Sequence, residues 1–149
     1  MDIRKAVFSD IDMLADNRVE FVCSIANIEN KDEFRVYTRE YLHKHFEDGS
    51  LLSYIAVDGG KIVSACILCI YQTLPIPSCM NGKTGLLLNV NTHKEYRRQG
   101  LAFTLISKLI EEAKLVNVSK IQLDYTDDGY QLYKKLGFTG LDSEMVLKL

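Results

Sequence analysis

The sequence predicts a mixed α/β fold (α+β mixed sheet) in which helices cover both faces of one sheet. Strand-like and helix-like apolar patterns follow one another in the order β-α-α-β-β-β-α-β-α-β. Asp58-Gly59-Gly60 joins two strand patterns and is a strong hairpin signal. A basic turn with a glycine, residues 96–102, separates a strand pattern from an amphipathic helix pattern. Together these features predict a sheet with helices packed on both sides.

The first third of the chain is predicted to form one strand and two helices. Residues 3–6 are typical of a short strand. Ser9 is expected to cap the first helix, with Asp10 among the acidic residues of its first turn. Apolar residues at helical spacing continue this helix to residue 23, and a second helix is expected over residues 31–46.

The middle of the chain is predicted to form three strands. Strands over residues 52–57 and 61–71 flank the hairpin turn. Residues 72–83 contain both prolines of the chain and are expected to form a loop. The next strand is expected over residues 84–90, directly before the basic turn.

The last third is predicted to alternate helices and strands. A helix over residues 102–116 has its apolar residues on one face. A strand over 120–125 and a short helix over 127–136 follow, and Gly137 ends that helix. Residues 138–149 are expected to form a terminal strand or hairpin arm.

Length and charge limit the classes of protein to which the chain belongs. A chain of 149 residues fits one domain, residues 1–149, with a sizeable core. Its net charge of −2 gives no electrostatic footprint for nucleic acid. There is no signal-peptide pattern and no apolar run long enough to span a bilayer. We therefore expect a cytoplasmic protein with no nucleic acid and no membrane as partner.

The four cysteines raise the question of a metal site or a disulfide. Cys66 and Cys69 have C-x-x-C spacing, but they lie in a strand pattern, where residues three apart point to opposite faces. No second pair completes a zinc site. We therefore expect free, buried cysteines and no metal.

The basic turn Tyr-Arg-Arg-Gln-Gly-Leu-Ala, residues 96–102, is the most informative stretch. The first N–H groups of a helix lack intrahelical partners, and the helix dipole places partial positive charge there. Arg97 and Arg98 add donors suited to phosphate oxygens, and Gly100 lets the backbone approach a bulky ligand. The turn predicts a site for a phosphorylated cofactor, with a solvated helix terminus as the alternative.

Two stretches resemble motifs of the GCN5-related N-acetyltransferase (GNAT) family. Residues 97–102 resemble the Arg/Gln-x-x-Gly-x-Gly/Ala signature that grips the pyrophosphate of acetyl-CoA. Residues 129–138 resemble the Leu-Tyr-x-x-x-Gly-Phe block, at the spacing found in the family. The resemblance covers nearly the whole chain and implies the GNAT acyl-CoA N-acyltransferase fold. It also implies an enzyme that moves the acetyl group of acetyl-CoA to a primary amine of a small molecule or peptide, by direct attack in a ternary complex.

The resemblance also implies the site residues. Residues 90–92 would place their backbone along the pantetheine arm, and the turn would hold the pyrophosphate. Tyr133 would act as the catalytic acid on the leaving thiolate, which a phenol can supply with a proton. The alternative for Tyr133 is a half-buried packing residue. The implied cofactor-binding residues are Val90, Asn91, Thr92, Arg97, Arg98, Gln99, Gly100, Leu101, Ala102, Phe103 and Thr126.

Three positions depart from the family pattern. Thr126 stands where many members carry Asn, and Lys94 replaces the usual proline before the glycine turn. Leu86 stands where histone-type members carry a catalytic glutamate. Leucine cannot take a proton, so His93, Asp124 or a water chain are the candidate bases, and a histone substrate is less expected.

The sequence indicates the residues that would bind the acceptor amine less clearly than those that would bind the cofactor. Acidic side chains in the helical part suit a cationic amine or form a solvated face. Residues 74–80 either border an apolar acceptor or pack as a loop. A homodimer is one possible assembly. A non-catalytic acyl-CoA-binding module is the alternative to the enzyme, and the net charge disfavours a nucleic-acid-binding protein that uses Arg97 and Arg98. The acidic residues are Asp16, Glu20, Glu29, Asp32 and Glu33.

Overall fold

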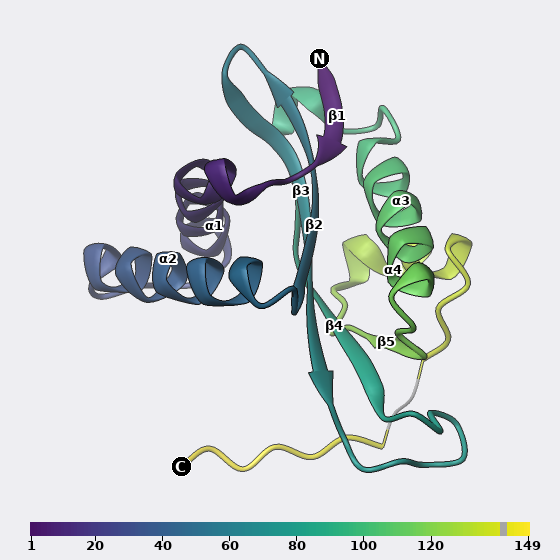
Figure 1. Ribbon diagram of the computed structural model, residues 1–149. Helices are drawn as coiled ribbons and strands as arrows, with labels where there is room; N and C mark the ends of the chain where they lie inside the picture. Colours follow the sequence, from purple (N-terminus) through teal and green to yellow (C-terminus); the bar gives the residue numbers. More distant parts are fainter. Residues whose placement is uncertain (141–142) are drawn as a thin grey trace.

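The computed structural model describes residues 1–140 and 143–149 and shows one five-stranded sheet between two layers of helices (Figure 1). Strands β1 to β4 pair antiparallel in sequence order, and β5 pairs parallel to β4. The mixed sheet predicted from the sequence is therefore confirmed. The strands are β1 (Asp2–Lys5), β2 (Leu51–Asp58), β3 (Lys61–Gln72), β4 (Lys83–Thr92) and β5 (Lys120–Gln122).

The helices lie on both faces of the sheet, as predicted (Figure 1). On one face lie α1 (Ile11–Ile25) and α2 (Lys31–Glu47). On the other lie α3 (Leu101–Leu115) and α4 (Asp127–Lys135). The chain crosses through α3 between β4 and β5, and this crossover allows the two strands to run parallel. None of the helices in the described ranges is long and apolar enough to span a bilayer.

Each face of the sheet has its own apolar core. Leu14, Leu42 and Ile55 are fully buried in the cluster under α1 and α2. Leu68 and Leu105 are fully buried in the cluster under α3 and α4. The sheet is thus anchored on both sides, which fixes the position of β4 relative to α3.

The hairpin between β2 and β3 forms where the sequence predicts it. Asp58 pairs with Lys61, so the loop consists of Gly59 and Gly60. Both glycines have positive φ, 56° and 76°. Two consecutive positive φ angles are what tight two-residue hairpin turns require, and glycine adopts them without steric cost.

The prediction that Ser9 caps the first helix is wrong. Ser9 lies inside a 3₁₀ helix, η1 (Phe8–Asp10), and makes no capping hydrogen bond. The Asp10 carboxylate accepts instead from the N–H of Val7 at 2.8 Å and from both terminal nitrogens of Arg4, at 2.7 and 2.9 Å. The buried carboxylate thus closes the turn of η1 and binds the arginine, and it makes no side-chain capping hydrogen bond to α1.

The predicted terminal strand over residues 138–149 is wrong in the part that the structure describes. Residues 138–140 and 143–149 form no strand, and Leu141 and Asp142 lie outside the described residues. β5 also ends at Gln122, earlier than predicted. Large apolar side chains near the C-terminus are almost fully exposed, so no burial favours pairing there.

The cysteines lie as the strand geometry predicts. Cys66 packs in the cluster under α3 and α4, and Cys69 packs against the cluster on the opposite face. All four cysteines are free thiols. Within residues 1–140 and 143–149, no group of three or more His, Cys, Asp or Glu side chains is arranged to hold a metal ion.

Candidate active site

The strand β5 lies at the edge of the sheet and separates from β4 partway along β4. They pair over only three positions, from Thr84 with Lys120 to Leu86 with Gln122. β4 then continues to Thr92, whereas the chain after β5 turns away into α4. Among the described residues, no strand pairs with residues 87–92 of β4 on the side of β5, and an extended ligand can pair with this open backbone edge.

A strained residue lies where the strands separate. Asn89 has φ 55°, which is uncommon for a residue other than glycine, and the register of β4 against β3 shifts at this point. The Asn89 side chain is buried and donates to Oδ1 of Asn17 at 3.0 Å. Strain of this kind persists only where neighbouring groups hold it, and it concentrates at functional sites.

The hydrogen bonds to β3 show which backbone groups of β4 face the open edge. The N–H of His93 donates to Val63, and the carbonyl of Asn91 accepts from the Ser64 hydroxyl at 2.9 Å. Asn91 and His93 therefore face β3. Because backbone groups of successive residues point to opposite sides of a strand, the flanking residues of the predicted set face the open edge. These residues are Val90 and Thr92.

The basic turn leads from β4 into α3 with its backbone donors free. Gly100 precedes α3 with φ 75°, and Arg98 has φ 61°. Within the described ranges, the N–H groups of residues 98–103 donate to no protein acceptor, and the first helical bond runs from Thr104 to the carbonyl of Gly100. The row of free donors at the positive end of the helix dipole is a site for an anion.

Side chains on both sides fix the position of this turn. The Tyr96 hydroxyl donates to the Asp58 carboxylate at 2.8 Å, which ties the turn to the β2–β3 hairpin. Nε of Arg97 donates to the carbonyl of Thr92 at 3.0 Å and leaves its terminal nitrogens for a ligand. The positive φ of Gly100 is one reason for glycine at this position, and an added Cβ would meet no protein atom within 4 Å, so the space beside it is open.

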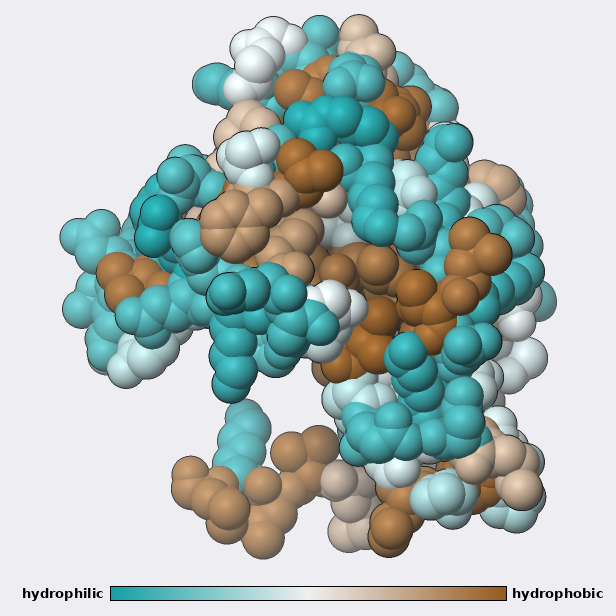
Figure 2. Space-filling view, in the orientation of Figure 1, coloured by the Kyte–Doolittle hydropathy of each residue, from teal (hydrophilic) through white to brown (hydrophobic). Residues whose placement is uncertain are grey.

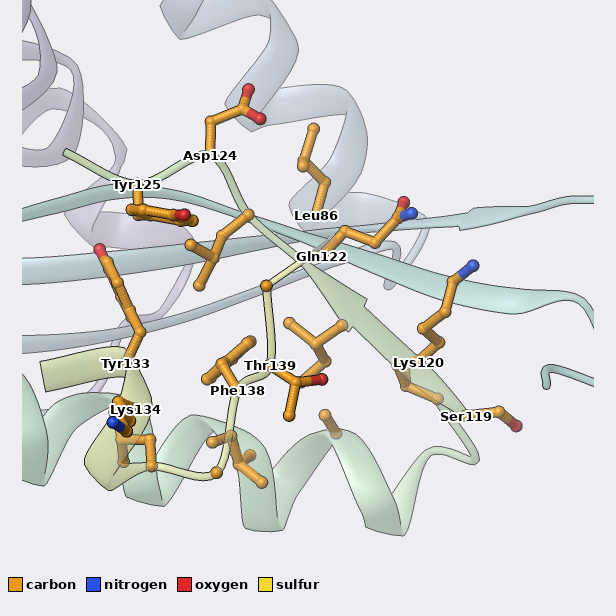
Figure 3. A pocket seen from close by; sticks show the side chains of 18 of the residues that line it. Leu86, Ser119, Lys120, Gln122, Asp124, Tyr125, Tyr133, Lys134, Phe138 and Thr139 are labelled. Atoms are coloured by element: carbon orange, nitrogen blue, oxygen red, sulfur yellow. The ribbon is translucent and has the colours of Figure 1, made fainter. Parts of the chain in front are cut away.

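Tyr133 extends from α4 toward the sheet (Figure 3). Its ring packs edge-on against Phe138, with 5.9 Å between the ring centroids. Burial raises the pKa of its hydroxyl above the ordinary value of 10.0, so the group stays protonated at neutral pH. It lines a groove of about 870 Å³ beside β5 and α4. In Figure 3 the hydroxyl points toward Tyr125, on the segment between β5 and α4.

Of the candidate bases, Asp124 lines the same groove as Tyr133. In Figure 3, Asp124 and Leu86 point to the opposite side of the sheet from Tyr133. Nε2 of His93 lies 3.6 Å from the Glu20 carboxylate of α1. The structure therefore gives His93 a carboxylate neighbour, while Asp124 is exposed.

The structure also shows where the remaining residues predicted from the sequence lie. Thr126 precedes α4 as its N-cap residue, and its hydroxyl makes no capping hydrogen bond. Asp16 forms an ion pair with Arg35 at 2.6 Å, so its charge is already balanced. The loop of residues 74–80 lies at the far end of the sheet from the basic turn (Figure 1), with Leu74 exposed and Cys79 buried.

One group of polar residues was not expected from the sequence. Asn17 of α1 is buried and forms amide hydrogen bonds with Asn89 and Asn91 of β4, each at 3.0 Å. Nη1 of Arg18 lies 3.5 Å from Oδ1 of Asn89. The available signal was Asn17 itself, a polar residue three positions after Leu14 on the apolar face of the helix.

Comparisons of the sequence with family models and of the structure with solved structures identify one family and one fold. Residues 20–138 match the model of the acetyltransferase (GNAT) family. None of the curated proteins matches the sequence significantly. The matched range includes the basic turn, the open edge of β4 and Tyr133.

Solved structures share the fold over nearly the full length. A predicted acetyltransferase from Clostridium acetobutylicum, crystallised with acetyl-CoA, is 25% identical, with a TM-score of 0.88 over 99% of this chain and 95% of its own. A GCN5-related N-acetyltransferase from Ralstonia eutropha JMP134 is 21% identical, with a TM-score of 0.85 over 99% and 97%. Glucosamine-6-phosphate N-acetyltransferase from Arabidopsis thaliana is 16% identical, with a TM-score of 0.74 over 99% of both chains.

Proposed function

Because this chain belongs to the acetyltransferase (GNAT) family and so uses acetyl-CoA as its donor, we propose that it acetylates a primary amine of a small molecule or peptide by direct attack in a ternary complex. One observation carries the proposal. The open edge of β4 leads directly into the row of free N–H groups at residues 98–103. The two features suit the extended pantetheine arm and the pyrophosphate of one cofactor molecule.

The turn is proposed to bind the pyrophosphate. Backbone donors from Arg98 to Phe103, Gln99, Leu101 and Ala102 among them, and the terminal nitrogens of Arg97 supply hydrogen bonds to phosphate oxygens. The backbone of Val90 and Thr92 supports the pantetheine arm along β4, and Asn91 holds the strand through its side chain. Thr126 would contact the arm from the α4 side. Such a site acts chiefly by positioning the thioester beside the amine.

The reaction needs one proton donor and one proton acceptor. The amine nitrogen attacks the thioester carbonyl carbon, and the C–S bond breaks. Tyr133 is proposed to give its proton to the thiolate, which its raised pKa supports because the phenol is protonated at neutral pH. The proton lost by the attacking amine passes to His93, which Glu20 accompanies, or to Asp124, directly or through water.

A panel of primary amines, followed with a thiol-reactive dye that detects released coenzyme A, tests the proposal. Release that depends on the amine, and that disappears in Gly100→Glu, would support acetyl transfer at this site. Binding of acetyl-CoA without release for any amine would favour the non-catalytic acyl-CoA-binding module, which the leucine at position 86 also suits.

The location, the partners and the assembly of the protein are also proposals. We propose a cytoplasmic location, since four free thiols are typical of a reducing compartment. The expected acceptor is an amine, with no nucleic acid and no membrane as partner, and a homodimer is the proposed assembly. Localisation of a tagged chain and the mass in solution test these two points.

A further inference from the structure

Among the described residues, Arg18 has no counterion, whereas three other arginines are paired. In the described part of the chain, no carboxylate lies within 4.0 Å of its guanidinium. By contrast, Arg4 pairs with Asp10, Arg35 with Asp16 and Arg39 with an aspartate of α1. The one side-chain hydrogen bond that Arg18 makes, to Asn89 Oδ1, is long at 3.5 Å. A guanidinium carries five N–H donors, so most of its capacity is left for a ligand.

The position of Arg18 makes an unpaired charge costly. The side chain is half-buried between α1 and the sheet, and this burial lowers the pKa of the guanidinium below its ordinary value. Removing a charge from water without a counterion is unfavourable, and a bound anion would offset that cost. Cys69, which faces the same side of the sheet, supplies no formal charge when its thiol is protonated, and burial raises the pKa of that thiol.

The network around Asn89 places Arg18 beside the part of β4 that directly precedes Val90. The amide nitrogen of Asn89 is committed to Asn17, which leaves its Oδ1 toward Arg18. Asn17 is fixed in turn by two hydrogen bonds with Asn91. Asn89 is the strained residue where β4 and β5 separate, and it directly precedes Val90. The guanidinium therefore lies 3.5 Å from the Asn89 side chain, next to the strand segment proposed to support the pantetheine arm.

Arg18 lies on the face of the sheet opposite α3 and α4. Tyr133 reaches the open edge from the α3 and α4 side, whereas Arg18 belongs to α1, on the opposite face. Leu88 of β4 is exposed beside Asn89. An attacking amine that approaches from this face meets the guanidinium next to the splay between the strands.

We propose that Arg18 binds an anionic group of the acceptor, a carboxylate or a phosphate, so that the substrate is a small amine that carries such a group. This inference rests on the proposed acetyl transfer. It differs from the cationic acceptor suggested by the acidic residues of the sequence, of which Asp16 is already paired with Arg35. A planar guanidinium binds both oxygens of a carboxylate or two oxygens of a phosphate.

Matched pairs of amines test this inference. The probes are glycine and β-alanine against glycinamide and β-alaninamide, and O-phosphoethanolamine against ethanolamine. Coenzyme A release at low amine concentration gives kcat/KM, and calorimetry on the enzyme saturated with coenzyme A gives amine affinity. We expect the anionic member of at least one pair to be favoured by about tenfold or more, which corresponds to about 1.4 kcal/mol. The carboxylate and phosphate pairs distinguish the two sources of charge.

Three variants separate recognition from folding. Arg18→Met keeps the apolar stem and should remove the preference for the anionic member while acetyl-CoA affinity is unchanged. Arg18→Lys should retain part of the preference, and it serves in place of the methionine variant if that one does not fold. Arg35→Gln removes an arginine that is already paired, and it should leave the preference intact.

The outcomes also separate this inference from the proposed function. Acetylation of neutral amines in preference to their anionic partners would overturn the role of Arg18 and leave acetyl transfer standing. An equal preference in the wild type and Arg18→Met would do the same. Binding of an anionic amine that depends on Arg18, without turnover of any amine, would support the anion site and contradict the proposed function. If the protein neither binds nor acetylates any of the anionic amines, the inference is overturned.

Discussion

Whether Tyr133 is a catalytic residue or only a packing residue depends on its hydroxyl group. We predict that Tyr133→Phe lowers the single-turnover rate of acetyl transfer by about 10²–10⁴-fold, because general acid catalysis contributes that much. The ring and its contact with Phe138 remain, so acetyl-CoA affinity should be unchanged. Rapid-quench single-turnover kinetics avoids masking by slow product release.

Tyr130→Phe is the matched control, since that ring lies one turn earlier and packs against Tyr125. It should transfer acetyl at nearly the wild-type rate. A Tyr133→Phe variant within about threefold of the wild type in single turnover would show that Tyr133 serves packing, since an effect so small is well below that of general acid catalysis.

The Asp10 carboxylate is predicted to stabilise the start of the helical layer. Asp10→Asn should lower the free energy of unfolding by about 2 kcal/mol at neutral pH, because it weakens charge-assisted bonds to Arg4. Thermal unfolding should show a melting temperature lower by about 4–8 °C. Ser9→Ala, which removes an exposed hydroxyl without a capping bond, should change stability by less than about 0.5 kcal/mol.

This effect should depend on pH with a defined sign. The bond to Arg4 holds the pKa of Asp10 below its ordinary value of 3.8 in the folded protein. The wild type should therefore keep its full advantage over Asp10→Asn above pH 3.8, and lose it as the pH falls through the lower pKa of the folded state. An advantage that persists unchanged at lower pH would contradict this account.

At the scale of a single element, the turn before α3 acts through its free backbone N–H donors and through the N-terminus of α3. We predict that Gly100→Glu removes measurable coenzyme A binding by calorimetry, because it places a carboxylate where the pyrophosphate would bind. The variant should also lose about 1–2 kcal/mol of stability, since a side chain is unfavourable at φ 75°.

Gly49→Glu provides a control with the same backbone strain. Gly49 also has φ 75° and open space around a built Cβ, but it lies in the turn between α2 and β2. The two variants should lose similar stability, and only Gly100→Glu should lose coenzyme A binding. Unchanged affinity in a folded Gly100→Glu protein would place the pyrophosphate elsewhere.

At the scale of the whole molecule, the C-terminal segment 143–149 leaves apolar surface uncovered. Figure 2 shows its apolar residues standing apart from the body of the molecule. The groove of about 870 Å³ beside β5 and α4 is itself partly apolar, with Ile121, Leu136 and Phe138 among its lining residues. The exposed residues of the segment are Met145, Val146, Leu147 and Leu149.

We predict that a second copy of the chain covers this surface. Light scattering should give twice the 17.0 kDa mass of one chain, and deletion of residues 143–149 should give a single chain. Leu115→Ser, which changes an exposed leucine at the end of α3, should leave the mass unchanged. A full-length chain that stays monomeric at the highest attainable concentration would refute the prediction.

Local patterns in the sequence were enough to predict most elements and the cofactor turn. The Gly59-Gly60 hairpin, the apolar face of α3 and the free donors at residues 98–103 depend on residues close in sequence, and the structure confirms them as structural features. The fold class and the family follow from the order of these elements and from two motifs. The assignment of Tyr133 as the acid stays a prediction from its motif.

Other features depended on contacts between distant residues. The Asp10 carboxylate is buried against Arg4 of β1 while Ser9 makes no capping bond, and the expected terminal strand did not form within the described residues. Asn17 and Asn89 meet across 72 positions. The sequence by itself determined most of the elements and the free backbone donors of the turn before α3, because these depend on local backbone geometry, whereas the binding of a phosphorylated cofactor at that turn stays a prediction. The tertiary structure alone decided which charges are paired, and it left Arg18 without a partner among the described residues because pairing depends on how helices pack over the sheet.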